Sequence, residues 1–202
     1  MSEIARGAEA TITKGIWHDR TSVTKERLKK GYRADSLDDR LRSMRTKSEV
    51  NLMRLARDAG VLTPLIFDVD LVDCRIVMEH VEGPTAKTVL ESSEDPGSVA
   101  TEIGRRVGML HRADIIHGDL TTSNIIITES GPSFIDFGLG ERSAEVEKKG
   151  VDLHLLKEAL DSAHSDHPEL YAAVTVSYLE AYPEGNAIVK LVEEIEKRGR
   201  YT

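Results

Sequence analysis

Apolar and polar residues alternate in short segments near the start of the chain, and this alternation predicts β-strands. One strand is expected at residues 10–17 and another at residues 22–28, with a turn at residues 18–21 between them. A second hairpin is expected from residues 65–71 and 75–81, after Pro64. The first part of the chain is therefore expected to form a small β-sheet.

Apolar residues change to helical spacing at residues 35–59. Leu37 and Leu41 repeat at i and i+4, the spacing continues at Leu52 and Leu55, and Gly60 ends the predicted helix. Later segments with an apolar face predict further helices, at residues 99–113, 152–163, 168–182 and 187–197.

The order of these elements predicts an α+β fold, with a small β-rich lobe and then a mostly helical one. The Glu82-Gly83-Pro84 turn is the best boundary, so a single domain at residues 1–202 would divide into lobes at 1–81 and 82–202. This is the plan of a minimal bilobal protein-kinase-like fold, in which a nucleotide binds between the lobes.

Composition narrows the class of protein. The chain of 202 residues can form one substantial core or two small lobes. Its net charge of -8 argues against autonomous binding to nucleic acid, and Cys74 is the only cysteine, which excludes an intramolecular disulfide. Neither a signal peptide nor a membrane-spanning stretch is visible. A cytoplasmic protein without membrane association is expected.

The strongest chemical signal is the segment at residues 117–124, which reads HGDLTTSN and is followed by Asp136-Phe137-Gly138. Protein kinases space these residues as H-R-D-x-x-x-x-N and D-F-G. Asp119 would accept the proton of the attacking hydroxyl, while Asn124 and Asp136 would hold magnesium. Apolar residues 125–127 and 134–135 predict a hairpin between the two loops. His117 is expected to be an orienting core histidine rather than a chemical participant.

Simpler interpretations exist for single residues of this set. An Asp near an Asn between a helix and a strand is usually a cap or a turn, and Asp119 alone would be interpreted so. The whole constellation favours phosphoryl transfer. Gly118 replaces the arginine that commonly binds a phosphorylated activation loop, so switching by loop phosphorylation is not expected. No A-P-E motif follows Asp136, so a conventional peptide-substrate platform is expected to be absent or reduced.

A kinase also needs a lysine on its third strand, paired with a helix glutamate, to neutralise the phosphates. Lys25 and Glu49 are the candidates by location. Only two strands are visible before the helix, so either one strand is missing or one lies at residues 3–10. Lys25 has the alternative interpretation of a solvated strand lysine. Four neighbouring cations compete for its role: Lys14, Arg27, Lys29 and Lys30.

The remaining contacts to ATP are expected at two segments. Gly7-Ala8-Glu9-Ala10 would form a short, largely non-glycine phosphate loop, in which Gly7 allows close backbone approach or is an ordinary turn glycine. At the end of the last strand, Met78 would pack behind the adenine. Backbone groups of Glu79 and Val81 would pair with its edge. ATP and Mg²⁺ are the expected cofactors.

Taken together, the motifs closely resemble one family, the small atypical kinase of the KEOPS/EKC complex (the PRPK family). The resemblance covers nearly the whole chain, and HGDLTTSN is its most specific part. It rests on Gly7-Ala8-Glu9-Ala10, Lys29-Lys30-Gly31-Tyr32-Arg33, Arg45-Thr46, Thr63-Pro64, and residues 117–124 and 135–140.

This resemblance implies a trimmed kinase fold and association with the threonylcarbamoyltransferase subunit and other KEOPS subunits. It also implies a role in threonylcarbamoyladenosine formation at tRNA position 37, with Ser/Thr autophosphorylation and ATPase activity. Carried over by position, Lys25 and Glu49 form the ion pair, Asp119 is the base, and Asn124 and Asp136 hold magnesium. Asp152 matches a position that steadies the catalytic loop, or is a favourable carboxylate at a helix N-terminus.

The family context also makes tRNA a candidate ligand, reached indirectly or through basic residues. Arg40, Arg42, Arg45 and Lys47 share a region with Lys29, Lys30 and Arg33, and the chain ends with the basic tail Lys197-Arg198-Gly199-Arg200. Such runs are equally well explained as a solvated helix face and as cations at a helix C-terminus.

Two rival functions remain open. Small-molecule kinases of the aminoglycoside or choline phosphotransferase type also carry H-G-D, but they usually add a G-D-P-type motif that residues 140–143 lack. The other rival is a non-catalytic subunit whose shape is gated by nucleotide. Slow intrinsic turnover, raised by a partner, fits an intact catalytic set without a peptide platform.

Overall fold

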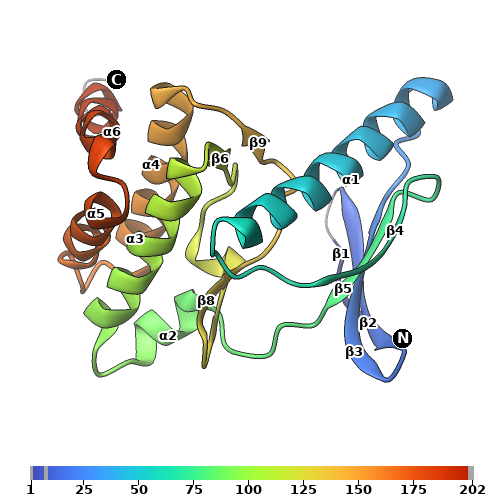
Figure 1. Cartoon of the computed structure of the whole chain (residues 1–202), viewed down its shortest axis with the longest axis horizontal. Helices are drawn as coiled ribbons and strands as arrows, with labels where there is room; N and C mark the ends of the chain where they lie inside the picture. The colour runs from blue at the N-terminus through green and yellow to red at the C-terminus, as the bar shows by residue number, and fades with distance from the viewer. Residues whose placement is uncertain (1, 7–8, 200–202) are drawn as a thin grey trace.

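A computed structural model describes residues 2–6 and 9–199 of the chain, with side chains described from residue 9 to residue 197. It combines an antiparallel sheet with a helical part, separated by one long helix (Figure 1). The predicted α+β arrangement, with a small sheet-containing lobe before a helical lobe, is confirmed. No helix among the described residues is long and apolar enough to cross a membrane.

The sheet has five strands in the order β1-β2-β3-β5-β4. They are β1 (Ser2–Arg6), β2 (Ala10–Trp17), β3 (Arg20–Arg27), β4 (Ile66–Asp70) and β5 (Arg75–Glu79). Because β1 pairs with β2, the question left open by the sequence is answered: a strand at Ser2–Arg6 overlaps residues 3–10, and β3 is the third strand. Lys25 therefore occupies the strand that a kinase lysine requires.

The turn between β2 and β3 is tighter than predicted. His18 and Asp19 have φ angles of 43° and 64°, and Trp17 pairs directly with Arg20. Two consecutive residues with positive φ are typical of the two-residue type I′ turn, whose twist matches that of the adjoining strands. The second strand accordingly begins at Arg20 rather than Ser22.

Helix α1 (Asp35–Asp58) confirms the longest predicted helix, although its buried face is not the one suggested by its leucines. Leu37 is exposed, and the buried residues of the first half are polar: Asp38, Thr46 and Glu49. The second half buries Leu52, Met53 and Ala56, and Gly60, with a φ of 85°, follows the helix end. Glu49 pairs with Lys25 and Arg27 of β3, whereas Asp38 pairs with Arg33 and Arg42.

The helical part contains α2 (Ala86–Ser92), α3 (Pro96–Arg112), α4 (Val146–Ala163), α5 (Leu170–Ala181) and α6 (Asn186–Gly199). Helix α2 was not predicted; it is short, and Thr85 caps it by accepting from the Thr88 N–H. Helix α4 begins at Val146, six residues before the predicted start. Its first turns lack an apolar pattern because Lys149 is buried through an ion pair with Asp114, at 2.7 Å.

Two short hairpins hold the loops of the predicted catalytic motif. Strands β7 (Ile125–Thr128) and β8 (Gly131–Phe134) pair as the sequence predicts. Strands β6 (Ile115–Ile116) and β9 (Glu141–Arg142) bracket the same region from either side. The segments before and after the two motifs are thus paired.

The segment that follows α1 is bound to the helical part by hydrogen bonds to its backbone carbonyl oxygens. The Phe134 N–H donates to Leu62 O at 2.8 Å, and Arg106 Nη1 donates to Gly60 O at 2.9 Å. The segment after α1 is therefore attached to both β8 and α3.

Close packing of α3 against α5 depends on glycine. A Cβ atom at Gly104 would lie 2.3 Å from both Val174 O and Ser177 Oγ. Gly104→Ala is expected to force these helices apart and to lower the free energy of unfolding by about 1–3 kcal/mol, the usual cost of overpacking. Chemical denaturation of both proteins measures the change.

A matched control lies on the same helix. At Gly97 a Cβ would meet only Asp95 Oδ1, at an ordinary 3.6 Å. Gly97→Ala should therefore be neutral or stabilising, since alanine is the better helix former. Equal effects of the two substitutions would contradict the packing argument.

Candidate active site

A cavity of about 310 Å³ lies between the sheet and the helical part. Apolar side chains from both sides line it, including Ile12, Val23 and Met78 from the sheet and Ile126 from β7. Polar residues are few: Lys25, Glu49, His80, Asn124 and Asp136. A mostly apolar cavity with a small number of polar groups is typical of a nucleotide-sized ligand site.

The predicted adenine-binding segment lies only partly in this cavity. Met78 and Val81 line it, but Glu79 does not. The Glu79 N–H donates to Leu65 O at 2.8 Å and its carboxylate accepts from the Leu65 N–H at 3.0 Å, so it joins β5 to the residue before β4. The Glu79 N–H and carboxylate are thus used within the sheet, and pairing of the adenine edge with backbone groups of this segment stays a prediction. His80 lines the cavity instead.

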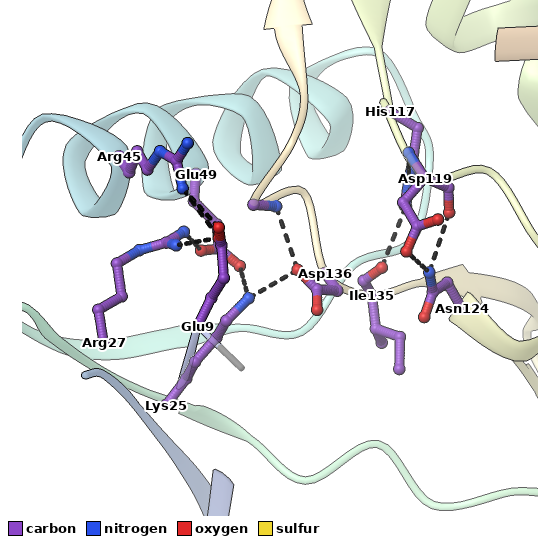
Figure 2. Close-up of polar contacts among 11 residues, drawn as sticks. Glu9, Lys25, Arg27, Arg45, Glu49, His117, Asp119, Asn124, Ile135 and Asp136 are labelled. Carbon is purple, nitrogen blue, oxygen red and sulfur yellow. Dashed lines mark hydrogen bonds and ion pairs between the residues drawn. The ribbon is translucent and has the colours of Figure 1, made fainter. Parts of the chain in front are cut away.

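The predicted phosphate loop is not reproduced as a set. Gly7 and Ala8 lie outside the described residues. Ala10 is the first residue of β2 and does not line the cavity. The Glu9 carboxylate is bound by Arg45 Nη1, at 2.8 and 3.0 Å, on the side of α1 (Figure 2). Glu9 is thus an ion-pair partner of the helix, and its contact with ATP stays a prediction.

Lys25 and Glu49 meet, as predicted. Lys25 Nζ donates to Glu49 Oε1 at 2.7 Å and to Asp136 Oδ1 at 2.6 Å (Figure 2). Lys25 and Glu49 are 5% and 1% exposed, so Lys25 is not a solvated strand lysine. One competing cation is also present, since Arg27 Nη2 donates to Glu49 Oε2 at 2.5 Å.

Asp119 and Asn124 are joined directly. Asn124 Nδ2 donates to Asp119 Oδ2 at 2.8 Å and to Asp119 O at 2.9 Å (Figure 2). Both donors of the amide are used on the Asp119 side, which leaves Asn124 Oδ1 as an acceptor. The Asn124 side chain lines the cavity, whereas Asp119 lies beside it. This arrangement suits a metal ligand at Asn124 and a base at Asp119.

His117 connects the two catalytic loops. Its Nδ1 accepts from the Asp119 N–H at 3.3 Å, so the ring proton is on Nε2, which donates to Ile135 O at 3.0 Å. The ring is fully buried and packs on Phe137, with centroids 4.5 Å apart. The geometry agrees with an orienting role for His117.

Asp136 presents an ionised carboxylate to the cavity. Its backbone is in the left-handed region, with a φ of 64°, and Oδ1 also accepts from the Gly138 N–H at 3.1 Å. Burial acts to raise the pKa of Asp136, but the adjacent Lys25 outweighs it and holds the pKa below the usual range. An amide oxygen and a carboxylate are hard oxygen donors that suit Mg²⁺. Phosphates and water normally complete such a site.

Asp152 supports the catalytic loop through its backbone. Its Oδ2 accepts from the His117 N–H and its Oδ1 from the Gly118 N–H, both at 2.8 Å. Because α4 begins at Val146, Asp152 lies beyond the first helical turn, and its interpretation as an N-terminal carboxylate is wrong. Burial acts to raise its pKa, but hydrogen bonds from His111 and the loop hold the pKa below its usual value.

His111 was missed by sequence reasoning. Its Nε2 lies 3.2 Å from Asp152 Oδ2 and its Nδ1 lies 3.0 Å from Tyr178 Oη, all buried. The only signal in the sequence is a polar residue beside the apolar positions of the predicted helix at residues 99–113.

The predicted basic surface is largely neutralised by acidic neighbours. Arg42 binds Asp38 and Asp39, at 2.9 and 2.6 Å, and Lys29 lies 3.1 Å from Asp35. Arg33 also contacts Asp38, at 3.5 Å. Arg40 and Lys47 are exposed on α1. In the tail, the side chains of residues 198–200 lie outside the described residues.

Stability is expected to fall on mild acidification because of His117. Burial lowers the pKa of His117 below its ordinary value, so the folded protein keeps the ring neutral. The unfolded chain takes up a proton near pH 6.5, so the stabilisation is complete above that pH and is lost as pH falls toward the folded pKa. Urea denaturation at pH 7.5 and pH 5.5 measures this loss.

The comparison variant is His117→Gln, which should lose less stability between the two pH values. His164, whose pKa burial also lowers, contributes to the slope in both proteins. An unchanged slope in His117→Gln would show that His117 is not the titrating group.

Comparison with known proteins gives a consistent result. Residues 17–140 match the family model described as the RIO domain. The chain is 42% identical, over its whole length, to the KEOPS complex subunit Bud32 of Pyrococcus abyssi, and it covers 96% of that protein.

Longer relatives match as well. The chain is 45% identical over 98% of its length to a protein of Methanothermobacter thermautotrophicus, and 41% identical over 97% to one of Methanosphaera stadtmanae. Both are named probable bifunctional tRNA threonylcarbamoyladenosine biosynthesis protein, and the chain spans only 36% of each.

Among solved structures, the fold is similar to the Rio2 kinase of Chaetomium thermophilum, determined as an ADP/Mg²⁺-phosphoaspartate complex. The TM-score is 0.67 at 17% identity, covering 100% of this chain and 72% of the other. The likeness extends over the sheet and the helical part together.

Proposed function

This chain belongs to the RIO-domain family and to the family of the KEOPS subunit Bud32, and from that membership we propose that it is an atypical Ser/Thr kinase and ATPase using Mg-ATP. Its activity would support threonylcarbamoyladenosine formation at tRNA position 37. One observation carries this proposal: Lys25, Glu49 and Asp136 form a connected charged cluster in the wall of a nucleotide-sized cavity. Domain limits at residues 1–81 and 82–202 are proposed with it.

Each residue of the site would have a separate role in phosphoryl transfer. Met78 and Val81 would hold the adenine, and Lys25 would turn from Asp136 toward the phosphates. Asn124 and Asp136 would hold magnesium, which when bound neutralises charge on the phosphates. Asp119, held in place by Asn124, would orient and accept the proton of the attacking hydroxyl or water.

Several features favour a partner-dependent ATPase over an efficient peptide kinase. Gly118 replaces the arginine that responds to loop phosphorylation, and no A-P-E motif follows Asp136. In the bifunctional relatives, the matched region shares one chain with a longer remainder. We therefore propose the threonylcarbamoyltransferase subunit and other KEOPS subunits as partners, in the cytoplasm. Contact with tRNA would be indirect, or through exposed residues such as Arg40 and Lys47 and the tail.

The test is phosphate release from γ-labelled ATP with magnesium, for the purified chain with and without the cognate threonylcarbamoyltransferase subunit. Strong stimulation by the partner is expected. Robust transfer to generic peptides or to a metabolite by the isolated chain, without stimulation, would contradict the proposal. ATP binding without turnover in either condition would indicate a non-catalytic, nucleotide-gated subunit.

A further inference from the structure

Arg27 is a buried cation to which the proposed mechanism gives no role. It lies two residues after Lys25 on β3 and is 5% exposed. Side chains two residues apart on a strand share one face of the sheet. Arg27 and Lys25 accordingly approach Glu49 together, and each occupies one of its carboxylate oxygens, at 2.5 and 2.7 Å (Figure 2). The Glu49 carboxylate thus binds two cations.

The guanidinium also reaches the turn that follows Asp136. A Cβ atom at Gly138 would lie 3.1 Å from Arg27 Nη2, 3.3 Å from Lys25 Nζ and 2.9 Å from Asp136 Oδ1. Both cations and the proposed metal ligand therefore converge on one small space beside the Gly138 backbone. Arg27 is as close to this turn as Lys25 is.

Hydrogen bonding within the protein does not fully use this arginine. Its Nη1 lies 3.9 Å from Glu9 Oε2, an ion pair longer than a hydrogen bond. Its Nε is buried and has no partner among the residues that the structure describes. Buried polar atoms usually have at least one hydrogen-bond partner. Arg27 does not line the 310 Å³ cavity itself, but its partner Glu49 does, so Arg27 lies behind the cavity wall.

We infer that Arg27 is a positioning residue of the phosphate site, which neutralises Glu49 so that the charge of Lys25 remains available to the nucleotide phosphates. With Arg27, the two cations balance the carboxylates of Glu49 and Asp136, whereas without it this cluster would carry one net negative charge. This inference rests on the proposed function, because it concerns the binding of Mg-ATP at the same site.

The short connection between the first two strands explains why an additional cation is useful. Only Gly7, Ala8 and Glu9 lie between β1 and β2. A glycine-rich loop presents several backbone N–H groups to phosphates. Here the sequence offers one glycine and one acidic residue, so a second buried cation compensates for fewer donors.

The test compares nucleotides of different charge by isothermal titration of the purified chain with Mg-ATP, Mg-ADP and adenosine. Arg27→Met is expected to weaken Mg-ATP binding by about 10- to 100-fold, with a smaller loss for Mg-ADP. Adenosine affinity should change by less than about twofold, because Coulomb attraction acts only on the phosphates. Arg20→Met, which removes an exposed cation from the other end of β3, should leave all three affinities unchanged.

Arg27→Lys keeps the charge without the planar fork and should retain more Mg-ATP affinity than Arg27→Met. It also carries the test if Arg27→Met fails to fold by circular dichroism, since the ratio of ATP to adenosine affinity should still fall. Equal losses for ATP and adenosine, or no loss of ATP affinity, would overturn the inference. A wild-type chain that does not bind Mg-ATP would overturn the proposed function as well.

Discussion

Asp136→Ala is expected to abolish magnesium-dependent ATP hydrolysis while leaving the fold intact. The substitution removes a carboxylate that is proposed to hold the metal, and loss of metal assistance costs about 10³-fold or more in rate. The Asp136 side chain is 43% exposed and Lys25 keeps Glu49 as its partner, so little stability should be lost. Phosphate release and thermal unfolding, measured on the same preparation, separate the two effects.

A suitable control for Asp136→Ala is Asp166→Ala. Asp166 is an exposed carboxylate between α4 and α5, far along the chain from both catalytic loops. It should hydrolyse ATP at the wild-type rate. If Asp136→Ala also kept that rate, with the same dependence on magnesium, the metal assignment would be wrong.

Asp119→Asn is expected to reduce the rate of phosphoryl transfer by about 10²–10⁴-fold, the usual contribution of a positioned base. The amide has the size of the carboxylate, and its oxygen can still accept from Asn124 Nδ2, so the loop should keep its conformation. What is lost is the ability to accept a proton. Single-turnover ATP hydrolysis, with Mg-ATP affinity measured separately, isolates this step.

Affinity for Mg-ATP should stay close to the wild-type value in Asp119→Asn, because Asp119 does not line the cavity. Asp136→Ala should instead weaken both affinity and rate. A rate loss below about tenfold would mean that Asp119 does not handle the proton in the limiting step.

Much of this site could be predicted from sequence because its key residues lie in contiguous motifs. Asp119 and Asn124 are five residues apart, and the hairpin that joins them to Asp136 begins with three isoleucines and ends at Phe134. The order of elements predicts Lys25 and Glu49, and the strand at Ser2–Arg6 supplies the strand that was not visible in the sequence.

What sequence could not supply were contacts between distant polar residues. Glu9 was expected at the phosphates, but Arg45 binds it; each is ordinary in sequence, and only the approach of β2 to α1 brings them together. The pairing of Arg27 with Glu49 and of His111 with Asp152 arose in the same way. Helix α4 likewise begins early because Lys149 finds Asp114, a partner 35 residues away.

Helix α1 is attached in different ways to the helical part and to the sheet. Beyond its C-terminal end, the chain is bound to β8 by a backbone hydrogen bond at Leu62 and to α3 by the Arg106 side chain at Gly60 O. On the sheet side, the links are charged pairs, Arg27 with Glu49 and Arg45 with Glu9. The Arg27–Glu49 pair is buried, so separating its charges would be costly, whereas the exposed Arg45–Glu9 pair contributes little. The sheet is therefore expected to stay attached to α1 through Glu49, and the length of the Lys25–Glu49 bond would report whether that attachment holds.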